Sequence, residues 1–244
     1  MKICFLGTGA SDWMRPGTSG ELRRTTSTLL DETLLIDVTQ SVLDMISDKT
    51  RIRDVFFTHS HADHFNLAAL AQLAPCRVYA HSSWAHIIAG EGLEVIALEC
   101  GVPVTLENGT TLLPMPSNHS TTRTDETTLH YLIERDGKRL LYATDGAWLL
   151  NSEHRLIGER TLDAAVFDAT IGDGVEGDWR IFEHNSVDMV RLMVRTMTRT
   201  GRLKADAPVF LTHLSRTLHG DQKTIESRLE RPLIACYDGL TVEI

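Results

Sequence analysis

The seven residues Thr58–His64, which read Thr-His-Ser-His-Ala-Asp-His, constrain the fold more than any other feature of the sequence. They directly follow Val55–Phe57, an apolar run typical of a strand buried on both faces. Three imidazoles and a carboxylate so close together cannot be packed in a core without partners, because each carries polar atoms. In an extended segment, the first two histidines point to one side. If a helix starts next, the aspartate and the third histidine lie in its first turn and face a neighbouring point. The segment therefore predicts ligands for two ions, and imidazole with carboxylate suits zinc, manganese or iron.

Three later residues occupy the same kind of position. His119, Asp145 and His213 each stand where an apolar run ends and a loop begins. Layered α/β folds place their chemistry at such strand ends. A lone histidine at a strand end is more often structural or solvated, but four clusters of this kind together favour a shared metal site.

Apolar runs and turn signals predict a layered fold. Short β-rich runs come first as hairpins and then alternate with helical stretches, an order that suits two sheets packed face to face with helices outside. A single domain over residues 1–244 is expected, because no linker divides the chain. The predicted helices are Phe65–Leu73, Ser152–Arg160 and Ser186–Arg199, the last with a core-facing methionine stripe. The predicted strands are Lys2–Leu6, Ser27–Leu30, Thr33–Asp37, Asp54–Thr58, Arg77–Ala80, Val95–Leu98, Thr111–Met115, Leu129–Glu134, Arg139–Thr144, Ala164–Asp168, Pro208–Thr212 and Leu240–Ile244.

Composition excludes several classes of function. The chain has 24 basic and 33 acidic residues, and its net charge of −9 argues against a broad surface for nucleic acid. Its apolar runs are too short to cross a membrane, and the glycine at position 7 comes too soon for a signal peptide. Four scattered cysteines do not indicate a disulfide framework or a thiolate zinc cluster. A cytoplasmic protein is expected.

The order of these motifs resembles that of the metallo-β-lactamase superfamily. The resemblance implies a four-layer αβ/βα sandwich of two mixed β-sheets with outer helices, and a dinuclear metal site at one edge. Asp37, after the run Leu34–Ile36, matches the first and mainly structural aspartate of the superfamily. By the same resemblance one ion would be held by His59, His61 and His119, the other by Asp63, His64 and His213, with Asp145 bridging.

The sequence is also similar to the PhnP family of phosphodiesterases, which is related to the tRNA 3′-processing ribonucleases. The similarity rests on short stretches from one end of the chain to the other, among them Leu6–Gly9, Thr212–Ser215 and Tyr237–Leu240. It implies that His184 is not a ligand but assists the reaction on the phosphodiester. A helix cap is the structural alternative for this residue, because asparagine and serine follow it. The stretch Ser11–Arg24 lacks the cysteines that hold a structural zinc in relatives.

Together these observations predict a metal-dependent hydrolase, a phosphoric diester hydrolase that uses metal-activated hydroxide. The expected cofactors are two divalent ions, manganese or zinc, with iron also compatible. The expected substrate is a small or cyclic nucleotide-like phosphodiester rather than nucleic acid, and a homodimer is possible. Asp63 is expected to orient water as well as bind metal. Arg123, Arg216 and His219 are weaker candidates for substrate contacts, because a solvated loop arginine is the commoner case. A thioesterase or lactonase, or a non-catalytic metal-bound binding module, remains an alternative.

Overall fold

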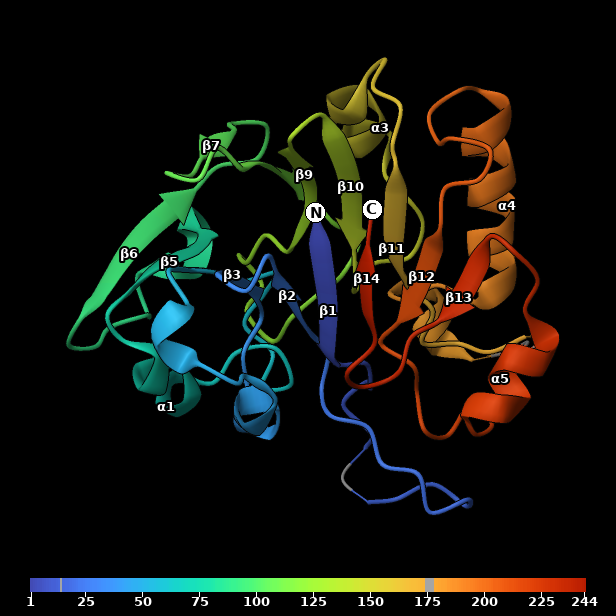
Figure 1. The fold of residues 1–244 in the computed structure, drawn as a ribbon, viewed down its shortest axis with the longest axis horizontal. Helices are drawn as coiled ribbons and strands as arrows, with labels where there is room; N and C mark the ends of the chain where they lie inside the picture. The colour runs from blue at the N-terminus through green and yellow to red at the C-terminus, as the bar shows by residue number, and fades with distance from the viewer. Residues whose placement is uncertain (14, 174–177) are drawn as a thin grey trace.

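Two seven-stranded sheets pack face to face in the computed structural model, which describes residues 1–13, 15–173 and 178–244. The strand orders are β14-β1-β2-β3-β4-β5-β6 and β13-β12-β11-β10-β9-β8-β7. Both sheets mix parallel and antiparallel pairs, and helices cover their outer faces (Figure 1). This arrangement confirms the predicted four-layer sandwich of two mixed sheets with outer helices. The two chain ends lie side by side, since the Met1 ammonium nitrogen is 3.2 Å from the Ile244 carbonyl oxygen.

The first sheet combines the N-terminal half of the chain with its last strand. Its strands are β1 (Lys2–Gly7), β2 (Ser27–Leu30), β3 (Leu34–Ile36), β4 (Asp54–Phe56), β5 (Cys76–His81), β6 (Leu93–Leu98) and β14 (Thr241–Glu243). The short helices that cover its outer face are η1 (Gln40–Met45), η2 (Lys49–Arg51), α1 (Leu67–Leu70), η3 (Ala71–Leu73) and α2 (Ser82–Ala85).

The second sheet takes the rest of the chain. Its strands and the helices beside them are β7 (Val104–Thr105), β8 (Thr111–Pro116), β9 (Leu129–Arg135), β10 (Lys138–Ala143), α3 (Asn151–Ile157), β11 (Ala164–Asp168), η4 (Trp179–Phe182), α4 (Val187–Arg199), β12 (Val209–Thr212), α5 (Gln222–Arg228) and β13 (Leu233–Ala235). None of the helices in the described part of the chain has the length and apolar character needed to cross a membrane.

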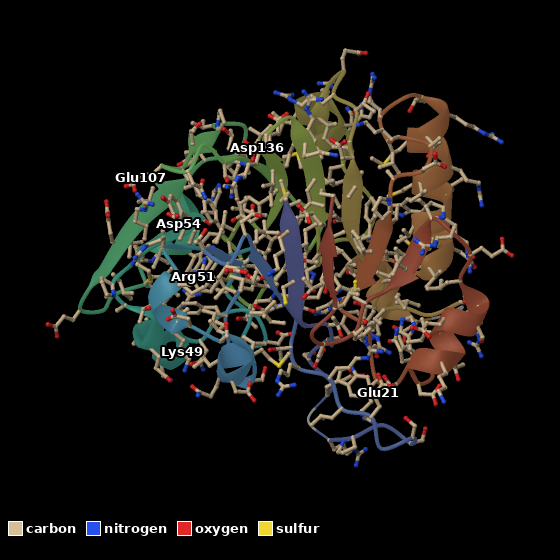
Figure 2. The ribbon with its side chains drawn as sticks, viewed as in Figure 1. Glu21, Lys49, Arg51, Asp54, Glu107 and Asp136 are labelled. Atoms are coloured by element: carbon tan, nitrogen blue, oxygen red, sulfur yellow. The ribbon has the colours of Figure 1, made fainter. Side chains whose placement is uncertain are left out.

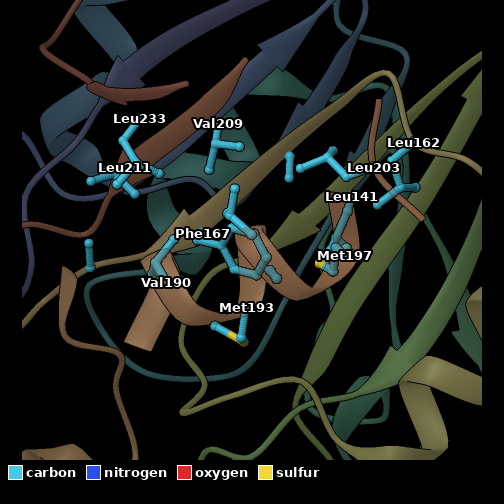
Figure 3. Packing of buried hydrophobic residues seen from close by; sticks show 14 of the residues in the cluster. Leu141, Leu162, Phe167, Val190, Met193, Met197, Leu203, Val209, Leu211 and Leu233 are labelled. Carbon is cyan, nitrogen blue, oxygen red and sulfur yellow. The ribbon is translucent and has the colours of Figure 1, made fainter. Parts of the chain in front are cut away.

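Three apolar clusters hold these layers together. One lies between the sheets and includes Phe5, Phe56 and Tyr131, and one fills the space between the first sheet and its helices. The third joins α4 to the second sheet, where the expected methionine stripe packs onto Phe167 (Figure 3). Burial of this stripe stabilises the helix, because apolar area removed from water contributes about 25 cal/mol per Å².

Most predicted elements are confirmed within a residue or two, including the β9–β10 hairpin with its turn at Asp136-Gly137. One expectation was wrong. Asp63 and His64 lie in a hydrogen-bonded turn rather than in the first turn of a helix, because α1 begins only at Leu67, where the Asn66 side chain accepts from the Ala69 backbone N–H. The helices α2 and α5, the 3-10 helices η1, η2 and η4 and the strands β7 and β13 were not predicted. Each is short, and β7 has only two residues.

The loop that contains Glu21 lies at one end of the sandwich. Figure 2 shows Asp136, at the β9–β10 turn, at the opposite end of the molecule from Glu21, in the loop of residues 11–24. Asp12 of this loop accepts hydrogen bonds from Ser215 and Arg216, which follow β12. The loop therefore borders the strand ends that carry the predicted site residues.

Candidate metal centre

The predicted ligands come from four strand ends that meet at one edge of the sandwich. The His59–His64 segment follows β4, His119 follows β8, Asp145 follows β10 and His213 follows β12. Asp145 and His213 have φ angles of 58° and 56°, in the left-handed region that non-glycine residues rarely adopt. Such backbone strain persists only where the surrounding structure enforces it, and it clusters at functional sites.

Three histidines form the first group. His59 Nε2 lies 3.0 Å from His61 Nδ1, and His119 Nε2 lies 3.2 Å from the same atom. Thr58 Oγ1 donates to Asp37 and therefore accepts from His59 Nδ1–H at 3.0 Å. This places the His59 proton on Nδ1 and leaves the lone pair of Nε2 facing the group. One shared proton cannot satisfy three converging ring nitrogens, whereas a cation can.

The second group combines carboxylates with imidazoles. His213 Nε2 lies 3.5 Å from Asp63 Oδ2 and 3.2 Å from Asp145 Oδ1. His64 Nε2 lies 2.9 Å from the other oxygen of Asp145 and 3.7 Å from Asp63 Oδ2. Asp145 thus contacts both imidazoles and also has an oxygen within 4.8 Å of a His59 ring nitrogen, so that it stands between the two groups.

Two buried aspartates orient the histidines in the same way. Asp37 Oδ2 accepts from His64 Nδ1 at 2.7 Å and, through the Thr58 hydroxyl, fixes His59. On the other sheet Asp168, at the end of β11, accepts from the Thr170 hydroxyl at 2.7 Å. That hydroxyl in turn lies 2.7 Å from His213 Nδ1. Histidine ligands usually bond their second ring nitrogen in this manner, which fixes the tautomer and the ring orientation.

His184 takes the place beside Asp168 that His64 takes beside Asp37. Its Nδ1 donates to Asp168 Oδ2 at 2.7 Å, and its ring centre lies 5.0 Å from that of His119 and 5.3 Å from that of His213. The side chain is 12% exposed. Its Nε2 is therefore the nitrogen left to meet a bound molecule. The helix cap is a different residue, because Ser186 Oγ accepts from Met189 N at the start of α4.

Burial and charge set the protonation of the group. Burial lowers the pKa of His59 and brings that of His119 to about 4, so both rings are neutral and can offer lone pairs. Burial opposes ionisation of Asp63, yet His64 and His213 hold its pKa below the usual range. For His184, burial lowers the pKa, but the charge of Asp168 and its hydrogen bond outweigh this and raise it to about 9.

The residues fit divalent metal ions by their unsatisfied atoms. His64 Nε2, His213 Nε2 and Asp145 Oδ2 are buried, and although the two ring nitrogens approach Asp145 to 2.9 and 3.2 Å, none of the three atoms has a partner with hydrogen-bond geometry among the described residues. Buried polar atoms without partners cost free energy, which a cation at this point would recover. Nitrogen and carboxylate oxygen donors together suit zinc, manganese or iron. Asp168 lies near His184 and His213, but its oxygens are engaged by N–H and O–H donors.

The weaker substrate candidates lie around this centre. Arg123 is exposed and is held through its backbone, whose N–H donates to Thr121 Oγ1 and whose carbonyl oxygen accepts from the Glu126 N–H. The Arg216 guanidinium donates through Nε to the Asp12 carbonyl oxygen at 2.9 Å. His219 Nε2 donates to the Ala169 carbonyl oxygen at 2.6 Å. Their roles toward substrate remain predictions.

Sequence reasoning missed two acidic residues that support the site. Asp168 was recognised only as the end of a strand, although a lone aspartate after a buried run was the same signal that marked Asp37. Glu126 accepts from the backbone and hydroxyl of Ser60 and from Thr121 Oγ1, and so ties two ligand-bearing loops together. Its position in an irregular loop gave no signal in the sequence.

This sandwich, with its cluster of histidine and aspartate at one edge, is that of a metallo-hydrolase. The sequence profile of the family described as Beta-lactamase superfamily domain matches residues 35–213. The chain therefore belongs to the metallo-β-lactamase superfamily. No curated protein matches it significantly in sequence.

Three of the most similar solved structures have the same fold over the whole chain. A diphosphatase from the PhnP family is 19% identical, with a TM-score of 0.70 over 99% of this chain and 97% of that one. Zn²⁺-bound PqqB from Methylobacterium extorquens is 19% identical, with a TM-score of 0.71 over all of both chains. The short form of human tRNase Z is 17% identical, with a TM-score of 0.72 over 100% and 99%.

Proposed function

We propose that the protein is a two-metal phosphodiesterase that hydrolyses a small or cyclic nucleotide-like phosphodiester. The observation that carries this proposal is the pairing of His184 with Asp168, because it supplies a proton donor beside the ligand group rather than within it. A departing alkoxide needs such a donor. The resemblance to PhnP-type enzymes supports the same assignment.

Two ions would use the seven converging side chains. We assign the first to His59, His61 and His119. The second would be held by Asp63, His64 and His213, with Asp145 between them. When bound there, manganese or zinc would supply hydroxide at neutral pH and would neutralise part of the charge of a phosphodiester.

The side chains of the protein then divide the remaining work. Asp63 is 16% exposed and presents a carboxylate that can orient the attacking water. His184 Nε2 gives its proton to the leaving oxygen, and Asp168 stabilises the protonated ring. Small substrates are favoured over RNA by the net charge of −9, since counterion release rewards basic surfaces.

Hydrolysis of three substrate classes tests this proposal. We expect the protein loaded with Mn²⁺ or Zn²⁺ to hydrolyse bis(p-nitrophenyl) phosphate and to leave a thioester and a lactone essentially unchanged. Activity on the carbon esters alone would overturn the choice in favour of a thioesterase or lactonase. Stoichiometric metal binding without hydrolysis of any of the three would indicate a binding module.

A further inference from the structure

Three large aromatic side chains that lie within five residues of Asp145 or His184 in the sequence are exposed to solvent. Phe182 is 76% exposed, Trp179 is 68% exposed and Trp148 is 40% exposed. Within residues 1–13, 15–173 and 178–244, none of the three rings packs against another aromatic ring. Exposed apolar area of this kind is unfavourable in water, and it marks binding sites when it gathers at one place.

Two asparagines tie the backbone at Trp148 and at Phe182 to the centre. The Asn118 amide nitrogen lies 3.1 Å from the carbonyl oxygen of Ala147 and 3.4 Å from that of Phe182. Asn185 accepts from the Trp148 backbone N–H at 2.8 Å and donates to the Gly146 carbonyl oxygen at 2.8 Å. The backbones of residues 146–148 and 182–185 are therefore neighbours. Asn118 directly precedes a proposed ligand, and Asn185 directly follows the proposed proton donor.

The backbone at Trp148 is strained as well. Its φ angle is 64°, a left-handed conformation that is a genuine outlier for a bulky residue. Glycine would adopt this conformation without cost. The chain instead presents an indole there, three residues after Asp145 and partly exposed. Strain of this kind is retained where the side chain has a use.

We propose that Trp148 and Phe182, together with Trp179 at the start of η4, form an aromatic rim that stacks the nucleobase of the substrate. Aromatic side chains bind bases of any sequence through their π-faces. A base is joined to its phosphate through one sugar, so a phosphate at the metal centre brings its base to the surrounding rim. The inference rests on the proposed function and narrows its substrate to a nucleotide ester.

Calorimetric titration of the metal-loaded protein tests the rim without relying on turnover. The probes are adenosine 5′-phosphate and ribose 5-phosphate, which share the phosphate and the sugar and differ in the base. We expect the nucleotide to bind about 10-fold more tightly, because stacking on an aromatic side chain contributes affinity of this order. Phe182→Ala and Trp148→Gly should each remove most of this preference.

Matched variants keep the result interpretable. Trp148→Gly removes the ring and suits the left-handed backbone, and thermal unfolding shows whether each variant is folded. Leu192 lies on α4 and is 48% exposed, so Leu192→Ala also removes an exposed apolar side chain. This control variant should keep the full preference for the nucleotide. Equal affinity for the two probes, or no binding of the nucleotide, would overturn the rim.

The test also separates this inference from the proposed function. Preference for the nucleotide without hydrolysis of bis(p-nitrophenyl) phosphate would support the rim and refute the catalytic assignment. Hydrolysis of bis(p-nitrophenyl) phosphate without a preference for the nucleotide would refute the aromatic rim and leave the proposed function standing. Sedimentation of the wild type and of Phe182→Ala adds a further outcome. If the wild type dimerises and the variant does not, the patch is a contact between two copies and the nucleobase assignment falls.

Discussion

Replacement of His184 by alanine separates catalysis from metal binding. Its Nδ1 lies 3.6 Å from Asp145 Oδ1, and its hydrogen bond goes to Asp168 at 2.7 Å. The bonds that orient His64 and His213 come from Asp37 and Thr170. The Thr170 hydroxyl also lies 3.3 Å from His184 Nδ1, but Asp168 and the His213 carbonyl oxygen hold this hydroxyl in place without that ring. We therefore expect the variant to keep its metal.

The loss in rate should depend on the leaving group. General acid catalysis contributes about 10²- to 10⁴-fold, which corresponds to about 3–5 kcal/mol of transition-state stabilisation. A loss of this size is expected with a dinucleotide such as thymidylyl-(3′→5′)-thymidine, whose alkoxide needs a proton. With bis(p-nitrophenyl) phosphate the loss should be less than about 10-fold, because nitrophenolate departs without one.

The assay compares kcat/KM for the two esters, with the metal content of the same preparations measured by mass spectrometry. His154→Ala is the matched control, because His154 lies exposed on α3. Equal losses on both esters would refute the role of His184 as an acid. A variant without metal would make this residue a ligand or a scaffold, and unchanged rates would leave it without a catalytic role.

Three further substitutions or treatments follow from single contacts. Asp168→Asn sets an amide donor against the Nδ1–H of His184. This variant should keep its metal, and its kcat on the dinucleotide should fall by more than 10-fold. Full activity would contradict the role of Asp168 in orienting His184. Gly146→Ala places a Cβ 2.8 Å from the His130 ring and should lower the free energy of unfolding in urea by about 1–3 kcal/mol, whereas no change would mean that the ring gives way freely. Burial and the charge of Asp54 raise the pKa of Cys76 to about 11, so its thiol is protonated at pH 8. We therefore expect an alkylating reagent to modify Cys76 only after denaturation, as measured by mass spectrometry. Modification of Cys76 in the native protein would refute this.

The sequence predicted the elements that carry long apolar patterns. The strands β8 to β12 and the helix α4 each combine several apolar residues with a clear period, and turn signals such as Asp136-Gly137 mark their ends. The short strands β7 and β13 escaped prediction, because they offer only two or three residues and are defined by their neighbours in the sheet, and β7 also lacks the apolar pattern that marks β3 and β4. Tertiary pairing decides such segments.

The same contrast holds for the candidate site. Histidines grouped within one segment can be recognised in a sequence. The ends of apolar runs indicated the remaining candidate ligands, His119, Asp145 and His213. The partners of these histidines were harder to find. Asp168 and Thr170 reach His213 from another strand, and Glu126 reaches Ser60 across 66 residues. No periodicity records contacts of this kind, since they exist only once the two sheets have packed.

Metal stoichiometry in the purified protein, loaded with Mn²⁺ or Zn²⁺ and freed of loosely held ions, tests the central assignment most directly. Seven side chains around two points predict about two ions per chain, and His61→Ala and His213→Ala should each reduce this to about one. One ion or none in the wild type, or two ions retained in both variants, would contradict the dinuclear centre.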